Sequence, residues 1–256
     1  MSRSTSTRGS SLALQLGQIL GIALVVLAIV AWMRLADADP PRPRMAATVQ
    51  IESTEPIAAP AGSRAAAPTS RVDQGWAARV AGATGIPVRA VLAYASADLT
   101  IDAEAPTCGL GWNTIAAIGA VESVHGTIGG SHLDAEGRPA PAIRGPALDG
   151  RGFAAIADSD DGAWDGDTAW DRAVGPMQFI PATWATWGAD GDGDGTSDPN
   201  QIDDAALATA RYLCAAGEVT DGGSWRAAVF SYNHLESYVD DVAAFANSYA
   251  AAGLPG

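Results

Sequence analysis

The segment at residues 112–126 most constrains the fold, because its apolar residues recur at helical spacing and predict one helix packed on a core. Ile115 and Ile118 lie seven and four residues before Glu122, so helical spacing places the segment's only acid on the apolar face, and Gly126 is the predicted C-terminal stop. A carboxylate that faces a core is costly unless it is paired or kept neutral by a raised pKa. A neutral carboxyl is what a general acid needs near pH 7. In the alternative reading, Glu122 pairs with an arginine or caps a neighbouring helix.

The charge of the chain narrows the classes of partner. The 256 residues carry a formal net charge of −14, and all 15 basic residues are arginine. From residue 72 onward there are 8 arginines against 25 acidic residues, a net charge of −17. Such a surface repels nucleic acid, which we therefore exclude as a partner. It is compatible with glycans and with divalent cations.

The N-terminal part predicts a membrane anchor. A 22-residue apolar run at 12–33 follows a short tail at 1–11, and it is long enough to span a hydrocarbon core of about 30 Å. Residues 34–71 are rich in proline and alanine and predict a disordered linker. We therefore expect a single-pass protein of the cell membrane with its folded domain on the extracytoplasmic side. The alternative is a secreted protein after signal cleavage, because Arg3 and Arg8 precede the run and residues 36–38 resemble a cleavage site.

Residues 72–256 predict an all-α domain with long ordered loops. The Gly/Asp/Pro-rich stretch 127–174 supplies most of these loops, and no segment alternates convincingly as a strand. Cys108 and Cys214 predict one disulfide in an exported domain, the alternative being two buried thiols in a cytosolic protein. The helices are expected at 72–83, 88–101, 111–125, 181–187, 202–216, 225–232 and 238–251.

Two further blocks carry polar residues in distinctive surroundings. Residues 174–184 place Gln178 between two rigid apolar turns before a helix start, and residues 231–234 close a helix with Ser-Tyr-Asn-His. Taken alone, Gln178 satisfies loop backbone groups and the second block is a helix cap. Together with residues 117–123, the blocks resemble, in order, the membrane-bound lytic transglycosylase B family of the lysozyme-like superfamily. The resemblance covers about residues 72–251.

This resemblance implies a lysozyme-like helical fold that acts on the glycan strands of peptidoglycan, with Glu122 as the single catalytic acid/base. In such enzymes the acid protonates the β-1,4 glycosidic oxygen between N-acetylmuramic acid and N-acetylglucosamine, and the acetamido group of the substrate stabilises the cationic centre. The glutamate then acts as a base while the muramoyl 6-hydroxyl attacks the anomeric carbon. The product is a 1,6-anhydromuramoyl end, and no water is consumed.

The resemblance also implies the residues that line the cleft. Polar side chains would position the acetamido group and the sugar hydroxyls, and two apolar side chains would form a wall. The polar set is Ser123, Gln178, Tyr232 and Asn233, and the apolar pair is Met177 and Phe179.

Two rival functions remain open on the same residues. A hydrolytic muramidase would use Glu122 with water and a second carboxylate, for which Asp149, Asp158 and Asp171 are the candidates. A non-catalytic peptidoglycan-binding or scaffold module would keep the fold without the chemistry.

A loop that begins at Asp190 follows the EF-hand rule and predicts a structural Ca²⁺ site, as the resembling family carries one calcium loop in this region. Glycine occupies position 6, and position 12 is Gln201 in place of glutamate, for which Asp203 or Asp204 is a candidate substitute. The alternative is a solvated acidic turn. The predicted ligands are the side chains of Asp190, Asp192, Asp194 and Asp198 and the carbonyl of Thr196.

A second acidic run at 158–167 lacks the EF-hand register. It is either a loop at the edge of the cleft or a second cation site, and the sequence leaves both open.

Overall fold

The computed structural model describes residues 71–151 and 154–253. The predicted tail, the anchor at 12–33 and the linker up to residue 70 lie outside the described residues. Within the described part, no helix is both long and apolar enough to cross a membrane. The disulfide between Cys108 and Cys214 is present and joins the segment before helix α4 (Trp112–Ser123) to the end of helix α6 (Ile202–Cys214).

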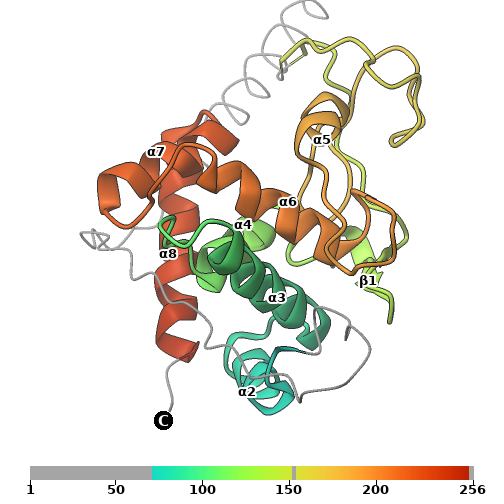
Figure 1. The fold of residues 1–256 in the computed structure, drawn as a ribbon. Coiled ribbons are helices and arrows are strands. Elements are labelled where there is room, and N and C mark those ends of the chain that lie inside the picture. The colour runs from blue at the N-terminus through green and yellow to red at the C-terminus, as the bar shows by residue number, and fades with distance from the viewer. Residues whose placement is uncertain (1–70, 152–153, 254–256) are drawn as a thin grey trace, which may run out of the picture. The chain divides into compact units, whose positions relative to one another are not determined.

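The described residues fold mainly into helices, which confirms the predicted all-α class (Figure 1). The predicted helices all form, with ends that shift by a few residues; the short helix at 181–187 has the predicted bounds. The helices are α2 (Gln74–Thr84), α3 (Val88–Glu104), α4 (Trp112–Ser123), α5 (Pro181–Trp187), α6 (Ile202–Cys214), α7 (Gly222–Tyr232) and α8 (Glu236–Gly253).

Local sequence explains where several helices begin and end. Asp73 caps α2 by accepting a hydrogen bond from the backbone N–H of Trp76, and Gly85 ends α2 in the left-handed conformation. Asp221 caps α7 through the backbone N–H groups of Gly223 and Ser224. These are the aspartate and glycine signals that mark helix starts and stops.

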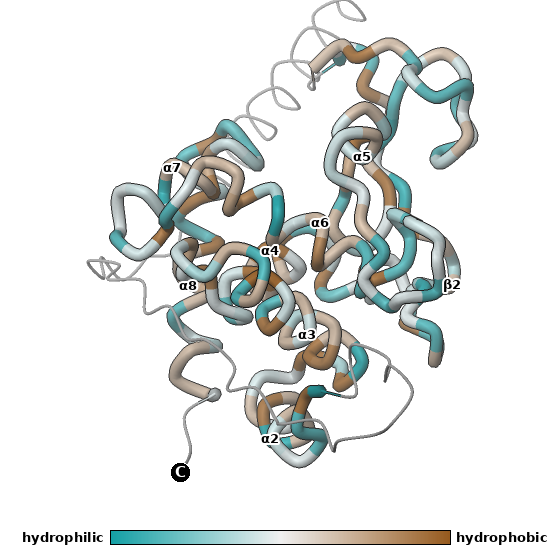
Figure 2. Tube along the Cα trace, viewed as in Figure 1, coloured by the Kyte–Doolittle hydropathy of each residue, from teal (hydrophilic) through white to brown (hydrophobic). Residues whose placement is uncertain are grey.

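Helix α4 forms the centre of the domain, with 10 of its 12 residues buried. It packs against α3, α6 and α8. Polar side chains fix it as well, because Asn113 donates to the carbonyl of Ala246 in α8 and Trp225 in α7 donates to the hydroxyl of Thr114. Figure 2 shows hydrophobic residues on the central helices α3 and α4, whereas hydrophilic and hydrophobic residues alternate along the long loops.

The end of α4 differs from the prediction. The helix stops at Ser123, and Val124, His125 and Gly126 follow with φ of 53°, 60° and 81°. Gly126 is thus the third left-handed residue rather than the stop. The ring of His125 explains the early end, since it turns inward, is 5% exposed and is held between the hydroxyls of two buried tyrosines, Tyr94 and Tyr249, at 3.2 and 3.0 Å.

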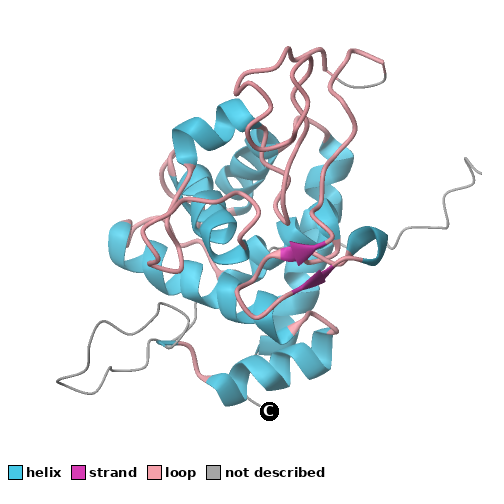
Figure 3. Ribbon diagram, turned by 90° about the vertical axis from the view of Figure 1, so that its right-hand side faces the viewer, coloured by secondary structure: helices cyan, strands magenta, loops and turns pink. Residues whose placement is uncertain are grey.

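The predicted loop region between α4 and α5 is confirmed, with one correction. It contains a short antiparallel hairpin of β1 (His132–Leu133) and β2 (Pro139–Ala140), although no strand was expected there. Figure 3 shows this hairpin in magenta beside the helices and the remaining loops in pink. Isolated bridges hold the loops in order, including one between Ala157 and Trp170.

Candidate active site

Glu122 lies in the last turn of α4 with a half-buried side chain. The hydroxyl of Tyr238, in α8, donates a hydrogen bond of 2.6 Å to Oε1 of Glu122. Burial raises the pKa of Glu122 to about 7, and the Tyr238 hydrogen bond opposes this rise. In the described residues no ion pair involves Glu122, so the arginine pairing considered from the sequence is not observed. The carboxyl is therefore balanced between its neutral and ionised forms near neutral pH.

Two tyrosines face this carboxyl. The pKa values of Tyr232 and Tyr238 are raised, mainly by burial and next by the charge of Glu122. Both phenols therefore stay protonated and act as hydrogen-bond donors. Sequence reasoning missed Tyr238, because only the packing of α8 on α4 brings it to Glu122.

Gln178 lies in a tight turn between Val174 and Phe179, whose backbones exchange hydrogen bonds of 2.9 and 3.1 Å. Gly175 and Gln178 adopt positive φ values of 75° and 50° in this turn. A Cβ at Gly175 would clash with the carbonyl oxygen of Pro199, so only glycine fits there. The side-chain amide of Gln178 donates to the Gly175 carbonyl at 2.9 Å, which fixes its orientation.

The three blocks recognised in the sequence meet at this turn. Ser123 donates a 2.6 Å hydrogen bond to the carbonyl of Pro176, and Tyr232 donates a 2.8 Å hydrogen bond to the carbonyl of Met177. Two consecutive carbonyls of the turn are thus held by hydroxyls from the ends of α4 and α7. These contacts fix the position of the turn relative to Glu122.

Three of the four other predicted cleft residues are buried more deeply than a cleft wall requires. Ser123 is 0% exposed, and its hydroxyl also accepts from the N–H of Gly126. Met177 and Phe179 are 0% and 2% exposed and belong to the core behind the turn. Asn233 is half-buried and ends α7. Direct contact of these four residues with a sugar stays a prediction.

The three carboxylates weighed as a second acid are engaged elsewhere. Asp171 is 0% exposed and accepts both of its described hydrogen bonds from Ser159, while Asp149 is paired with Arg151 at 3.7 Å. Asp158 accepts backbone N–H groups within its own loop. None of the three contributes to the pKa shift of Glu122.

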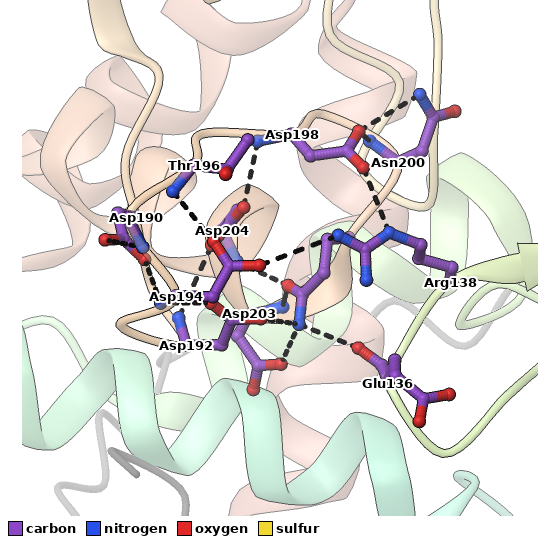
Figure 4. Close-up of polar contacts among 12 residues, drawn as sticks. Glu136, Arg138, Asp190, Asp192, Asp194, Thr196, Asp198, Asn200, Asp203 and Asp204 are labelled. Carbon is purple, nitrogen blue, oxygen red and sulfur yellow. Dashed lines mark hydrogen bonds and ion pairs between the residues drawn. The ribbon is translucent and has the colours of Figure 1, made fainter.

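The acidic loop before α6 gathers three carboxylates, as Figure 4 shows. Asp190, Asp192 and Asp204 offer oxygens that all lie within 4.8 Å of one another. Burial, followed by the charge of Asp192, raises the pKa of Asp204 to about 6, although backbone hydrogen bonds from Gly191 and Asp198 oppose this. Asp204 is one of the two residues considered from the sequence as a substitute for position 12.

Gln201, at position 12 of the loop, links the loop to neighbouring segments by hydrogen bonds. The amide nitrogen of Gln201 donates to Asp192 at 3.0 Å and to the carbonyl of Glu136 at 2.9 Å, and its oxygen caps α6. Arg138 pairs with Asp198 at 3.1 Å. The second guanidinium contact of Arg138 is with Asp194, at 4.0 Å. The loop is therefore tied to the β1–β2 hairpin by Gln201 and Arg138. Figure 4 shows Arg138 reaching Asp198.

Comparison with known proteins gives one match. Residues 153–248 match the family described as the transglycosylase SLT domain. The match implies peptidoglycan as the binding partner and lytic transglycosylase activity on it. It includes Gln178, Tyr232 and Tyr238 but begins after Glu122. Neither the curated proteins nor the solved structures gave a match.

Proposed function

We propose that this protein is a lytic transglycosylase that cleaves the β-1,4 bond between N-acetylmuramic acid and N-acetylglucosamine, with Glu122 as its single acid/base. One observation carries the proposal: the Glu122 carboxyl has a pKa of about 7 and lies beside two protonated tyrosines, with no charged neighbour that shifts it. Such a group can give up and regain a proton near neutral pH, as a general acid that later serves as a base must do.

In this mechanism Glu122 acts twice. Tyr238 donates to Oε1 of the carboxyl, so Oε2 carries the proton and donates it to the glycosidic oxygen. The C1–O bond breaks, and the acetamido group of the substrate stabilises the cationic sugar. The carboxylate then takes the proton from the muramoyl 6-hydroxyl as that oxygen bonds to C1. The proton balance closes without water, and the product is the 1,6-anhydro sugar.

The turn that holds Gln178 supplies the second part of the proposed site. Gln178 and Asn233 are the amides that we propose bind the acetamido group and the sugar hydroxyls. Ser123 and Tyr232 support them by holding the turn through its carbonyls. A hydrolytic muramidase is the weaker alternative, since Asp149, Asp158 and Asp171 are all engaged away from Glu122.

The test compares the full-length protein with its Glu122→Gln variant in binding to, and release of soluble fragments from, insoluble peptidoglycan. Glutamine preserves the shape of the side chain and cannot donate the proton. We expect normal binding and at least about a hundredfold slower release, the usual contribution of general acid–base catalysis. Equal release by both proteins would reject Glu122 as the acid, and binding without release by either would favour a scaffold module.

We propose a structural Ca²⁺ in the loop that starts at Asp190. The carboxylates of Asp190, Asp192 and Asp204 fit such an ion, because they converge, are hard oxygen donors and form no ion pair with an arginine among the described residues. The proposed ligand set also includes the Thr196 carbonyl and the carboxylates of Asp194 and Asp198, both of which pair with Arg138 in this structure. When bound, the ion would offset the mutual repulsion of these acids and hold the loop against α6.

We also propose that the domain works on the extracytoplasmic side of the cell membrane, anchored by residues 12–33. The disulfide supports an oxidising compartment, and peptidoglycan lies outside that membrane. Protease treatment of intact spheroplasts tests the topology: an anchored external domain is digested, whereas a cytoplasmic domain survives. A domain found in the medium would indicate signal cleavage instead.

A further inference from the structure

A second group of acids lies in the long loop that precedes the Gln178 turn. Asp158, Asp160 and Asp171 each offer one carboxylate oxygen, and these oxygens all lie within 4.8 Å of one another. Two backbone hydrogen bonds bring the two arms of the loop together, from Asp158 to the carbonyl of Ala169 and from Asp171 to the carbonyl of Ile156. The cluster shares no residue with the loop that starts at Asp190.

The buried charge of Asp171 has no cationic partner in the described residues. Asp171 is 0% exposed, and its oxygens accept from the backbone N–H and the hydroxyl of Ser159, both at 2.8 Å. The adjacent Arg172 turns away and pairs with Asp167 at 2.8 Å. Hydrogen bonds from one neutral serine do not offset a buried carboxylate that faces two others.

Asp160 provides an independent observation. Its Oδ1 is buried and accepts no hydrogen bond in the described residues, whereas Oδ2 accepts from the backbone N–H of Trp164 at 2.9 Å. A buried carboxylate oxygen that lacks any donor is rare in folded proteins and commonly marks an ion or a water. Asp158 cannot relieve it, since a carboxylate has no proton to donate and its Oδ1 already accepts from Asp160 and Gly162.

We infer that Asp158, Asp160 and Asp171 bind a divalent cation, and that Ca²⁺ is the best fit. Three carboxylates supplied by the protein suit Ca²⁺, whereas Mg²⁺ is usually held by one or two carboxylates and keeps several waters. The three oxygens all lie within 4.8 Å of one another, which is close enough for one ion to bind them together. The ion would satisfy the orphaned oxygen of Asp160 and neutralise Asp171.

This ion would stabilise the loop that precedes the Gln178 turn. It would fasten the arm that carries Asp158 and Asp160 to Asp171, which lies three residues before Val174, where the Gln178 turn begins. The site does not depend on the proposed enzymatic activity. A protein that binds peptidoglycan without cleaving it would use the same brace.

The experiment counts Ca²⁺ ions on the full-length protein by calorimetric titration. The variant is Asp160→Asn, which keeps the acceptor for the Trp164 N–H and removes one charge. The matched control is Asp161→Asn, which makes the same change on the exposed neighbour. Both are made in the natural chain and again in an Asp192→Asn background, which disables the other loop.

We expect Asp160→Asn to lose one equivalent of Ca²⁺, or to bind it at least tenfold more weakly, in both backgrounds, while Asp161→Asn binds like its parent. Equal stoichiometry and affinity for the two variants would overturn the proposal. Circular dichroism checks that both are folded. If Asp160→Asn unfolds, terbium titration of the natural chain replaces the comparison. The proposal requires two bound ions. A count of one ion, lost in Asp192→Asn, would overturn it.

Discussion

The hydroxyl of Tyr238 donates a 2.6 Å hydrogen bond to Oε1 of Glu122, so the last helix of the domain holds the carboxyl at the end of the central one. Burial favours the neutral carboxyl, and this hydrogen bond favours the ionised form. The protonation of Glu122 therefore depends on the packing of α8 against α4.

Removal of the Tyr238 hydroxyl should shift the pH dependence of activity. In Tyr238→Phe the ionised form of Glu122 loses a donor, so its pKa rises and the alkaline limb of kcat/KM moves to higher pH. The loss of a charge-assisted hydrogen bond should also lower kcat/KM about tenfold at the optimum. The measurement is a pH–rate profile from pH 4 to 9 on soluble glycan strands. A profile with an unmoved alkaline limb would show that Tyr238 does not act on Glu122.

Glu122 should also make the stability of the protein depend on pH. Its pKa is raised from 4.5 to about 7 by folding, so between these values the folded state binds more protons than the unfolded state. The free energy of unfolding therefore falls as pH rises through this window and stays lower above it. Glu122→Gln has no carboxyl to ionise and so avoids this loss of stability. Its Tm relative to that of the natural protein should therefore increase as the pH rises from 4 to 8. Glu218→Gln, at an exposed site, is the control and should show no such gain.

The sequence predicted those parts of the structure that depend on local signals. Apolar spacing, capping residues and cysteine count located the helices, the disulfide and the position of Glu122 on α4. It could not place Tyr238, because this contact depends on how α8 crosses α4. It also misplaced the end of α4, where burial of the His125 ring prevails over the expected glycine stop.

In the two acidic loops, too, the sequence predicts some features and only the structure shows the others. The EF-hand spacing identified Asp190 and Asp192, but only the folded chain shows that Asp204 reaches them while Gln201 braces the loop. In the loop that contains Asp158, Asp171 is eleven residues from Asp160 in sequence. Backbone hydrogen bonds between the two arms of this loop bring the two residues together, and no periodicity in the sequence predicts these bonds.

Gly175 should tolerate no side chain. Gly175→Ala adds a Cβ against the Pro199 carbonyl and strains a backbone with φ of 75°, which should cost about 3 kcal/mol of unfolding free energy. Gly166→Ala is the matched control, since its φ is 79° but nothing lies within 4 Å of the added Cβ. It should lose only about 1 kcal/mol. Urea denaturation measures both, and equal losses would show that the contact with Pro199 is unimportant.

Chelation should destabilise the domain if the loop at Asp190 holds Ca²⁺. Removal of an ion present at about a hundred times its Kd costs about 2.7 kcal/mol, which is several degrees in Tm for a domain of this size. Asp204→Asn should lower the Tm in Ca²⁺ and reduce the effect of EDTA, whereas Asp241→Asn, an exposed control, should do neither. An unchanged Tm of the natural protein in EDTA would contradict the calcium assignment.

The most direct test of the central claim is mass spectrometry of the fragments that the full-length protein releases from purified peptidoglycan. The account predicts 1,6-anhydromuramoyl ends from the natural protein and none from Glu122→Gln. Reducing muramic acid ends that carry oxygen from labelled water would contradict it. They would identify a hydrolase that needs a second carboxylate.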